Sequence, residues 1–252
     1  MLPLYGTNSF RYLVDELRLV VNRVKLKDDD ITILEQNFPY YSRLSDRHKK
    51  EFRNKLEKIL TLKKFIGRAG LIVSSEMKLL IGATMVMVTF GWSNLRLKHF
   101  DKILLYPNSY YSTISKEYHR GEVNPKLGII VLSWSCFLEG LNTTNDGFCL
   151  GIHEVAHALK LENQIRSNGE SDFFNPGVYA SFQKLAYREI LGINSGETTV
   201  FRVSGGLNYD EFFAVALETF FEKPHEFYAH NPALYNILVQ LMRQNPRVWI
   251  RS

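Results

Sequence analysis

The sequence predicts a mainly helical α+β fold with a small central sheet. Long segments repeat their apolar residues at helical spacing, as residues 46–66 and 209–222 do, and they lie on both sides of the middle of the chain. Two short apolar stretches, at residues 102–106 and 128–133, are typical of buried strands. Because strands do not alternate regularly with helices, the pattern favours α+β over a doubly wound α/β fold.

The first part of the chain is expected to be largely helical. Its expected elements, in order, are helices at 8–24, 30–37 and 46–66, a strand at 71–73 and a helix at 76–91. Ser45 and Ser75 stand where a hydroxyl can cap the first turn of the helix that follows.

The second part supplies the two apolar strands and more helices. Its expected elements are strands at 102–106 and 128–133, a helix starting near Phe148, and helices at 177–191, 209–222 and 231–243, with a loop or hairpin at 195–206. The strand at 128–134 lies either at the edge of the sheet, where it could pair with an extended peptide, or inside the sheet. Its apolar run is the same in both cases.

Composition excludes several classes of protein. The net charge of +5 is mild, and the basic residues between 43 and 64 are mixed with acidic ones, so a solvated helix face is favoured over nucleic-acid binding. Cys136 and Cys149 show no pairing pattern, which favours a reducing compartment and a cytoplasmic location. The N-terminus lacks the layout of a signal peptide, and the longest apolar run, 79–92, is too short to span a bilayer.

The strongest chemical signal is the sequence His153-Glu-Val-Ala-His157 inside an apolar segment. On a helix, histidines four residues apart lie on one face, where two imidazoles can bind one tetrahedral zinc ion. Glu154 can then act as the general base for a water molecule that attacks a carbonyl. The pattern predicts a zinc-dependent hydrolase; two buried, hydrogen-bonded histidines without a metal are the structural alternative.

Zinc needs a third protein ligand, and the apolar helix at 209–222 carries two candidates. Glu211 and Glu218 are seven residues apart and therefore lie on nearly the same face. One could bind zinc while the other accepts the free N–H of a ligating histidine, and the spacing does not decide between them. Alternatively, both lie at the surface. His119, His225 and His230 are weaker candidates, and Cys149 is expected to be an inert buried thiol.

The chain resembles the Mlc titration factor A family, a group of bacterial zinc peptidases whose catalytic core is similar to lethal-factor metalloproteases of the gluzincin type. The resemblance covers roughly residues 38–245, and the first 35 residues carry none of it. The matching pieces are Leu44-Ser-Asp-Arg47, Lys64-Phe-Ile-Gly67 with Gly70-Leu71, Ile103-Leu-Leu-Tyr-Pro107, Val131-Leu-Ser-Trp134, Gly147-Phe148, His153-Glu-Val-Ala-His157, and Glu211-Phe-Phe-Ala-Val215 with Glu218, Phe220, Phe221 and Pro224.

This resemblance implies a zincin-like metallopeptidase fold, with zinc bound by His153, His157 and Glu211 and with Glu154 as base. It leaves Glu218 the role of supporting a ligand, and it implies aminopeptidase-like activity on a peptide substrate. Members also bind a transcriptional repressor of sugar uptake, so a transcriptional regulator is a candidate partner. We divide the chain into an N-terminal helical segment, 1–37, and a metallopeptidase domain, 38–252, with a helical part to about residue 95 and a catalytic part from about residue 96.

Two departures from the family pattern leave a second function open. Lys160 replaces an acidic residue after the second histidine, and Ser204 replaces a tyrosine suited to stabilising an oxyanion. Tyr209 could take over that catalytic role if the backbone is rearranged. The alternative to an active peptidase is therefore a weakly active or non-catalytic zinc protein that binds a transcriptional regulator.

Overall fold

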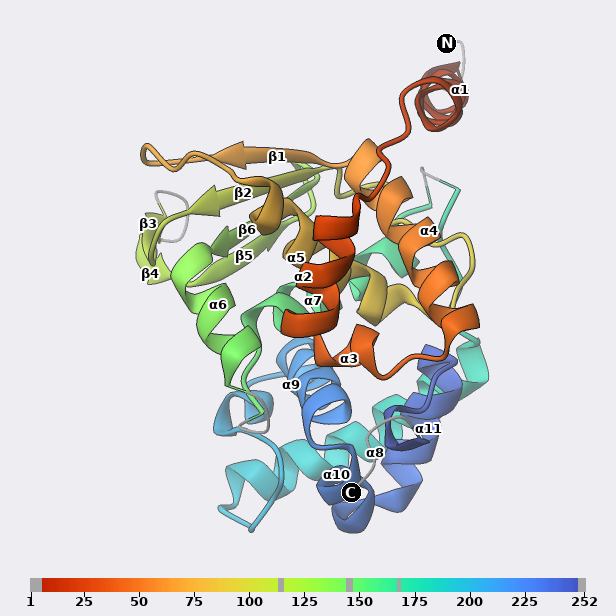
Figure 1. The fold of residues 1–252 in the computed structure, drawn as a ribbon. Coiled ribbons are helices and arrows are strands. Elements are labelled where there is room, and N and C mark those ends of the chain that lie inside the picture. Colours follow the sequence, from red (N-terminus) through yellow and green to blue (C-terminus); the bar gives the residue numbers. More distant parts are fainter. Residues whose placement is uncertain (1–5, 113–115, 144–146, 167–168, 249–252) are drawn as a thin grey trace, which may run out of the picture.

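The computed structural model describes residues 6–112, 116–143, 147–166 and 169–248 (Figure 1). Side chains are described from Leu13 onward. Among the described residues, no helix combines the length and the apolar character that crossing a membrane would need.

A four-stranded mixed sheet lies beside the helices, with strand order β1-β2-β6-β5 (Figure 1). Its strands are β1 (Lys64–Gly67), β2 (Lys102–Tyr106), β5 (Gly121–Asn124) and β6 (Ile129–Ser133). The β1–β2 and β2–β6 pairs are parallel, whereas β5 runs antiparallel to β6 and forms one edge. A separate hairpin pairs β3 (Tyr110–Ser112) with β4 (Glu117–His119).

The sheet is apolar on both faces because its central strands are. Ile103 and Leu132 point into the main core, whereas Leu104 and Val131 form a smaller apolar cluster with Tyr110 of the hairpin on the opposite face. Such continuous apolar strands are typical of strands covered on both sides.

Five helices precede or interrupt the first strands. They are α1 (Gly6–Val21), α2 (Asp28–Asn37), α3 (Pro39–Ser42), α4 (Asp46–Leu62) and α5 (Ser75–Thr89). The hydroxyls of Ser45 and Ser74 accept hydrogen bonds from the backbone N–H groups of His48 and Met77, so they cap α4 and α5. Leu34 of α2 is fully buried in the main core.

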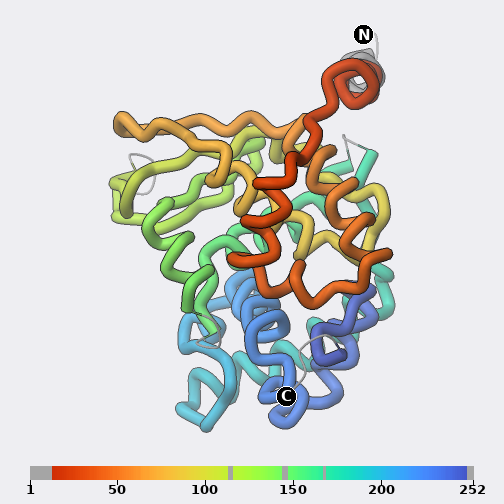
Figure 2. Tube along the Cα trace, viewed as in Figure 1, coloured from red at the N-terminus to blue at the C-terminus, as the bar shows by residue number. Residues whose placement is uncertain are grey.

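The remaining helices are α6 (Trp134–Asn142), α7 (Leu150–Gln164), α8 (Pro176–Asn194), α9 (Tyr209–Glu222), α10 (Pro224–His230) and α11 (Pro232–Met242), with 3-10 turns at Val203–Gly206 and Pro246–Val248. Of these helices, α6 and α7 lie next to the sheet and in the middle of the molecule, and the last four lead to the end away from the sheet (Figure 1 and Figure 2). Helix α9 packs directly on α7, and ten consecutive residues of α9, from Phe212 to Phe221, are buried. A helix buried all round belongs to the centre of a core.

The predicted α+β class with a small sheet is confirmed, but three details were wrong. The strand expected at 71–73 is irregular; the first strand is Lys64–Gly67, which the sequence analysis assigned to the end of a helix. A short apolar run fits a helix end or a strand equally well, and it is the pairing with β2 that makes Lys64–Gly67 a strand. Ser74, not Ser75, caps α5.

The position of the last apolar strand is also settled. The strand at Ile129–Ser133 has neighbours on both sides, so of the two placements that the sequence left open, the internal one is found. The edge next to it is β5, which the sequence analysis did not predict, as it did not predict β3 and β4.

A candidate metal centre between two buried helices

Helix α7 carries the histidine pair on one face. Its other faces are buried, and the rings of His153 and His157 meet edge to face with their centroids 4.7 Å apart. Their side chains are only 15% and 17% exposed. The face that carries both histidines is turned toward α9, from which Glu211 approaches.

Three side chains bring their lone pairs to one point. The Nε2 atoms of His153 and His157 are 3.1 Å apart. Glu211 Oε2 lies 3.4 Å from Nε2 of His153, and Oε1 lies 3.3 Å from Nε2 of His157. Among the described residues this is the one group of three or more histidine, cysteine or acidic side chains whose ligand atoms lie within 4.8 Å of one another. Two imidazole nitrogens and a carboxylate are a donor set that suits zinc.

The charges of this cluster support a cation at its centre. Burial lowers the pKa of His153, but hydrogen bonds to Glu211 and Glu218 outweigh it and raise that pKa to about 10. The same histidines hold the pKa of Glu211 well below its usual range. A divalent cation bound between the two imidazoles and the carboxylate would take the place of the proton that this raised pKa favours.

Glu154 lies beside the histidine pair, under the edge strand β5. It is 5% exposed, and its burial raises its pKa to about 7, against the opposing charges of the histidines. A Cβ atom added to Gly121 of β5 would lie 2.5 Å from Glu154 Oε1. Only glycine therefore allows β5 to lie this close to the glutamate.

Glu218 holds the far side of His153. It is fully buried, and its Oε1 lies 3.5 Å from His153 Nδ1 and accepts a hydrogen bond from the backbone N–H of Cys149 at 3.2 Å. Its other oxygen pairs with the guanidinium of Arg202, which also donates to the carbonyl of Gly147. A carboxylate in this position can orient the imidazole and select its tautomer.

Tyr209 and Lys160 do not join the metal cluster. Tyr209 begins α9, two residues before Glu211 and thus about 200° around the helix from it. Its side chain is 40% exposed, and its ring lies 6.4 Å from that of Tyr187. The structure therefore does not bring Tyr209 to the cluster. Lys160 forms an ion pair with Asp210 of α9. The lysine that stands on α7 in place of an acidic residue is therefore matched by an acidic residue on α9.

The weaker candidates from the sequence lie elsewhere. His230 pairs with Glu189 at 2.9 Å, and His119 lies in β4, where its ring is 6.2 Å from that of Tyr110. Cys149 is buried, and burial raises the pKa of its thiol. A thiol that stays protonated is a poor nucleophile and a poor metal ligand.

Sequence reasoning missed Gly121 and Arg202. Gly121 carries no signal, because its role depends on a strand that approaches a helix from elsewhere in the chain. Arg202 had an indirect signal: a glutamate on a helix as apolar as α9 needs a positive partner.

The chain is similar to a metallo-peptidase family and to several known proteins. The family model of the glucose-regulated metallo-peptidase M90 matches residues 14–243. An uncharacterised protein of Synechocystis sp. is 28% identical over 221 residues, which cover 82% of this chain and 80% of the relative. Mlc titration factor A proteins of Yersinia pestis and Yersinia pseudotuberculosis are 24% identical over 228 residues, 83% of each chain. The family match begins within α1, earlier than the sequence motifs had indicated.

Proposed function

This chain belongs to the glucose-regulated metallo-peptidase M90 family, and we propose that it is a zinc-dependent peptidase that binds its metal with His153, His157 and Glu211. The observation that carries the proposal is the convergence of the two Nε2 atoms and the Glu211 carboxylate, all within 4.8 Å of one another. Three protein ligands leave a fourth tetrahedral position open, as in catalytic rather than structural zinc sites.

Each residue of the cluster has a distinct task. A zinc ion would supply a Lewis acid that polarises a peptide carbonyl and lowers the pKa of water. Glu154 takes the proton of the attacking water and passes it to the leaving amine. Glu218, held by Arg202, accepts the Nδ1 proton of His153 and keeps Nε2 of that ring turned toward Glu211.

The edge strand β5 supports a peptide as substrate. In the part of the chain that the structure describes, it pairs with one strand, β6, and Gly121 at its start lies close to Glu154. An extended peptide that added to this edge as a further strand would pass its backbone carbonyls near the base. We further propose that the enzyme removes residues from the N-terminus of its substrate, as an aminopeptidase does. Hydrolysis rates of peptides with free and with acetylated N-termini test this.

The test of the proposal is the variant Glu154→Gln in the zinc-loaded protein. We expect zinc to be retained and peptide hydrolysis to fall by about 10²–10⁴-fold, because the amide cannot accept the proton. Glu197→Gln, which changes an exposed glutamate, is the matched control and should cleave at the wild-type rate. Hydrolysis by Glu154→Gln at the wild-type rate would contradict the mechanism.

A second function is favoured by the relatives named Mlc titration factor A and by the absence of Tyr209 from the cluster. In this alternative the protein binds a transcriptional regulator, and its metal supports the fold with little or no turnover. Recovery of a regulator with both wild-type protein and Glu154→Gln, without measurable hydrolysis by either, would support it. The two buried, free cysteines agree with a cytoplasmic setting for either function.

A further inference from the structure

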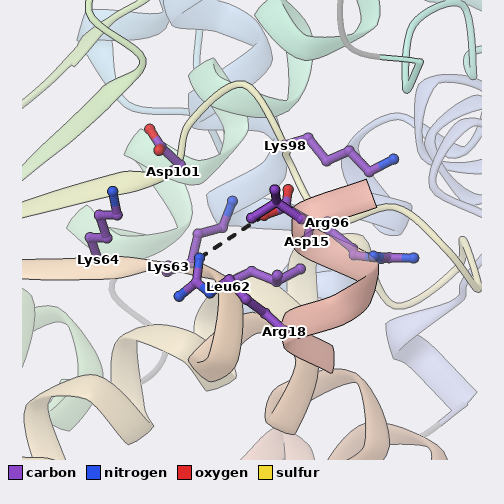
Figure 3. Close-up of a pocket in the computed structure, with 9 residues that line it drawn as sticks. Asp15, Arg18, Leu62, Lys63, Lys64, Arg96, Lys98 and Asp101 are labelled. Carbon is purple, nitrogen blue, oxygen red and sulfur yellow. Dashed lines mark ion pairs between the residues drawn. The ribbon is translucent and has the colours of Figure 1, made fainter. Parts of the chain in front are cut away.

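A cavity of about 170 Å³ lies beneath α1, on the side of the molecule that carries the start of β1 (Figure 3). Five of its nine lining residues are cationic, namely Arg18, Lys63, Lys64, Arg96 and Lys98. Asp15 and Asp101 are the two acidic ones. The cations come from three separate segments: α1, the junction of α4 with β1, and the chain leading into β2. Such convergence of like charges is unfavourable unless an anion offsets it.

Part of this charge is balanced within the fold. Arg96 pairs with Glu16 at 2.9 Å, and Lys98 lies 3.8 Å from Glu170. Lys63 is buried and donates to the backbone carbonyls of Leu97 and Phe100, which carry no formal charge. The positive potential extends to Lys58 nearby, since burial and the charges of Arg96 and Arg23 lower its pKa.

Arg18 and Lys64 are the cations best placed to meet a ligand. Arg18 donates to the carbonyl of Thr61 at 2.7 Å, but its carboxylate neighbour, Asp15, is 4.0 Å away. Lys64 is exposed and forms no ion pair with a residue that the structure describes. Figure 3 shows Arg18 and Lys63 in the middle of the cavity, with Lys64 on one side and Lys98 on the other.

Helix α1 is attached to the body mainly through its polar side. Besides Arg18 and Glu16, its C-terminal extension places Arg23 2.9 Å from Glu57. Among the described side chains of α1, Leu17 is 62% exposed and Val20 82%, whereas Val14 lines the cavity. Polar contacts of Arg18 and Glu16 therefore contribute to the docking of α1, and an anion shared by Arg18 and Lys64 would fix α1 to the body.

We propose that this cavity is a binding site for a phosphate-class dianion, either inorganic phosphate or the phosphate of a small monoester, held by Arg18 and Lys64 and favoured by the charges of Lys63 and Lys98. Arginine and lysine together suit such an anion, because a guanidinium offers a planar pair of donors and an ammonium a compact charge. Occupancy ties α1 to β1. The site shares no residue with the metal cluster.

The experiment is calorimetric titration of the full chain with inorganic phosphate and with glycerol 3-phosphate, at constant ionic strength set by sodium chloride. We expect saturable binding, weakened about tenfold or more in Lys64→Met and in Arg18→Met. Lys126→Met, which removes an exposed lysine elsewhere, should bind like the wild type. Tighter binding of one titrant identifies whether the ligand is the free ion or a monoester.

A second measurement reports on α1. Phosphate should slow proteolytic cleavage between residues 22 and 27 in the wild type but not in Lys64→Met. Equal affinities in the wild type, Lys64→Met and Lys126→Met, or no binding beyond the chloride control, would overturn the proposal. His153→Ala should bind phosphate normally, so failure of the metal site and failure of this site are distinguishable.

Discussion

Between α7 and α9, two imidazoles and Glu211 are partly buried and Glu218 is fully buried. In α4 and just after it, Lys55 and Lys63 are buried. The lysines donate to the backbone carbonyls of the segment after α5, Lys55 to Thr89 and Trp92. Their charges are spread over separate acceptors. In the other region, the Nε2 atoms and the Glu211 carboxylate face one another across a single point.

The way in which the partners of buried charges are arranged distinguishes a structural role from a functional one. A buried charge needs partners in either case. On α4 those partners are backbone groups that need a donor themselves, so the lysines hold a loop in place. Between α7 and α9 three ligand atoms converge on one point, where a single cation can bind all of them.

The largest expected effect concerns Arg202, which pairs with the fully buried side chain of Glu218. Arg202→Met should lower the free energy of unfolding by about 3 kcal/mol, because it leaves a buried carboxylate without its partner. Urea denaturation measures the change. The double variant Arg202→Met/Glu218→Gln should recover part of the loss, and if it is no more stable than Arg202→Met, the pairing argument is wrong.

The open side of the metal cluster is tested at Gly121. Gly121→Ala should reduce kcat/KM by about 10²-fold while zinc content stays unchanged, because the new methyl group displaces Glu154 or the edge strand by a fraction of an ångström or more. Gly177→Ala is the matched control, because Gly177 is exposed, also lacks a positive φ, and a Cβ atom there would meet nothing closer than 3.4 Å. If Gly121→Ala cleaved at the wild-type rate, the close approach of β5 to Glu154 would not matter for catalysis.

The lysine region is tested by pH. Burial lowers the pKa of Lys55 from its ordinary 10.5 to about 7. Between these values the unfolded chain binds more protons than the folded one, so this contribution to stability is complete above pH 10.5 and is lost as pH falls toward 7. Relative to Lys55→Met, the wild-type unfolding free energy should rise by up to about 1.4 kcal/mol per pH unit from 7 to 10. Parallel pH profiles would refute the shift.

The smallest effect is expected for Lys160 and Asp210, which link α7 to α9 at the surface side of the cluster. The Asp210 side chain is 64% exposed, so the coupling energy from a double-mutant cycle with Lys160→Ala and Asp210→Ala should stay below about 1 kcal/mol. A coupling of several kcal/mol would mean that this pair holds the two helices together.

Local rules explain what the sequence could predict. The four-residue spacing of His153 and His157 and the seven-residue spacing of Glu211 and Glu218 follow from helix geometry, so both faces could be assigned without a structure. Which glutamate approaches Nε2 depends on how α9 sits on α7, and spacing left that choice open. Gly121 and Lys64–Gly67 depend on pairing between distant strands, which no local pattern records.

The central claim is that His153, His157 and Glu211 together bind a single metal ion. Elemental analysis of the purified protein tests this claim most directly. The account predicts about one zinc per chain in the wild type, and loss of that zinc in His153→Ala and in Glu211→Ala, with Glu197→Ala unaffected. Folded wild-type protein that takes up no zinc, or Glu211→Ala that retains it fully, would contradict the account.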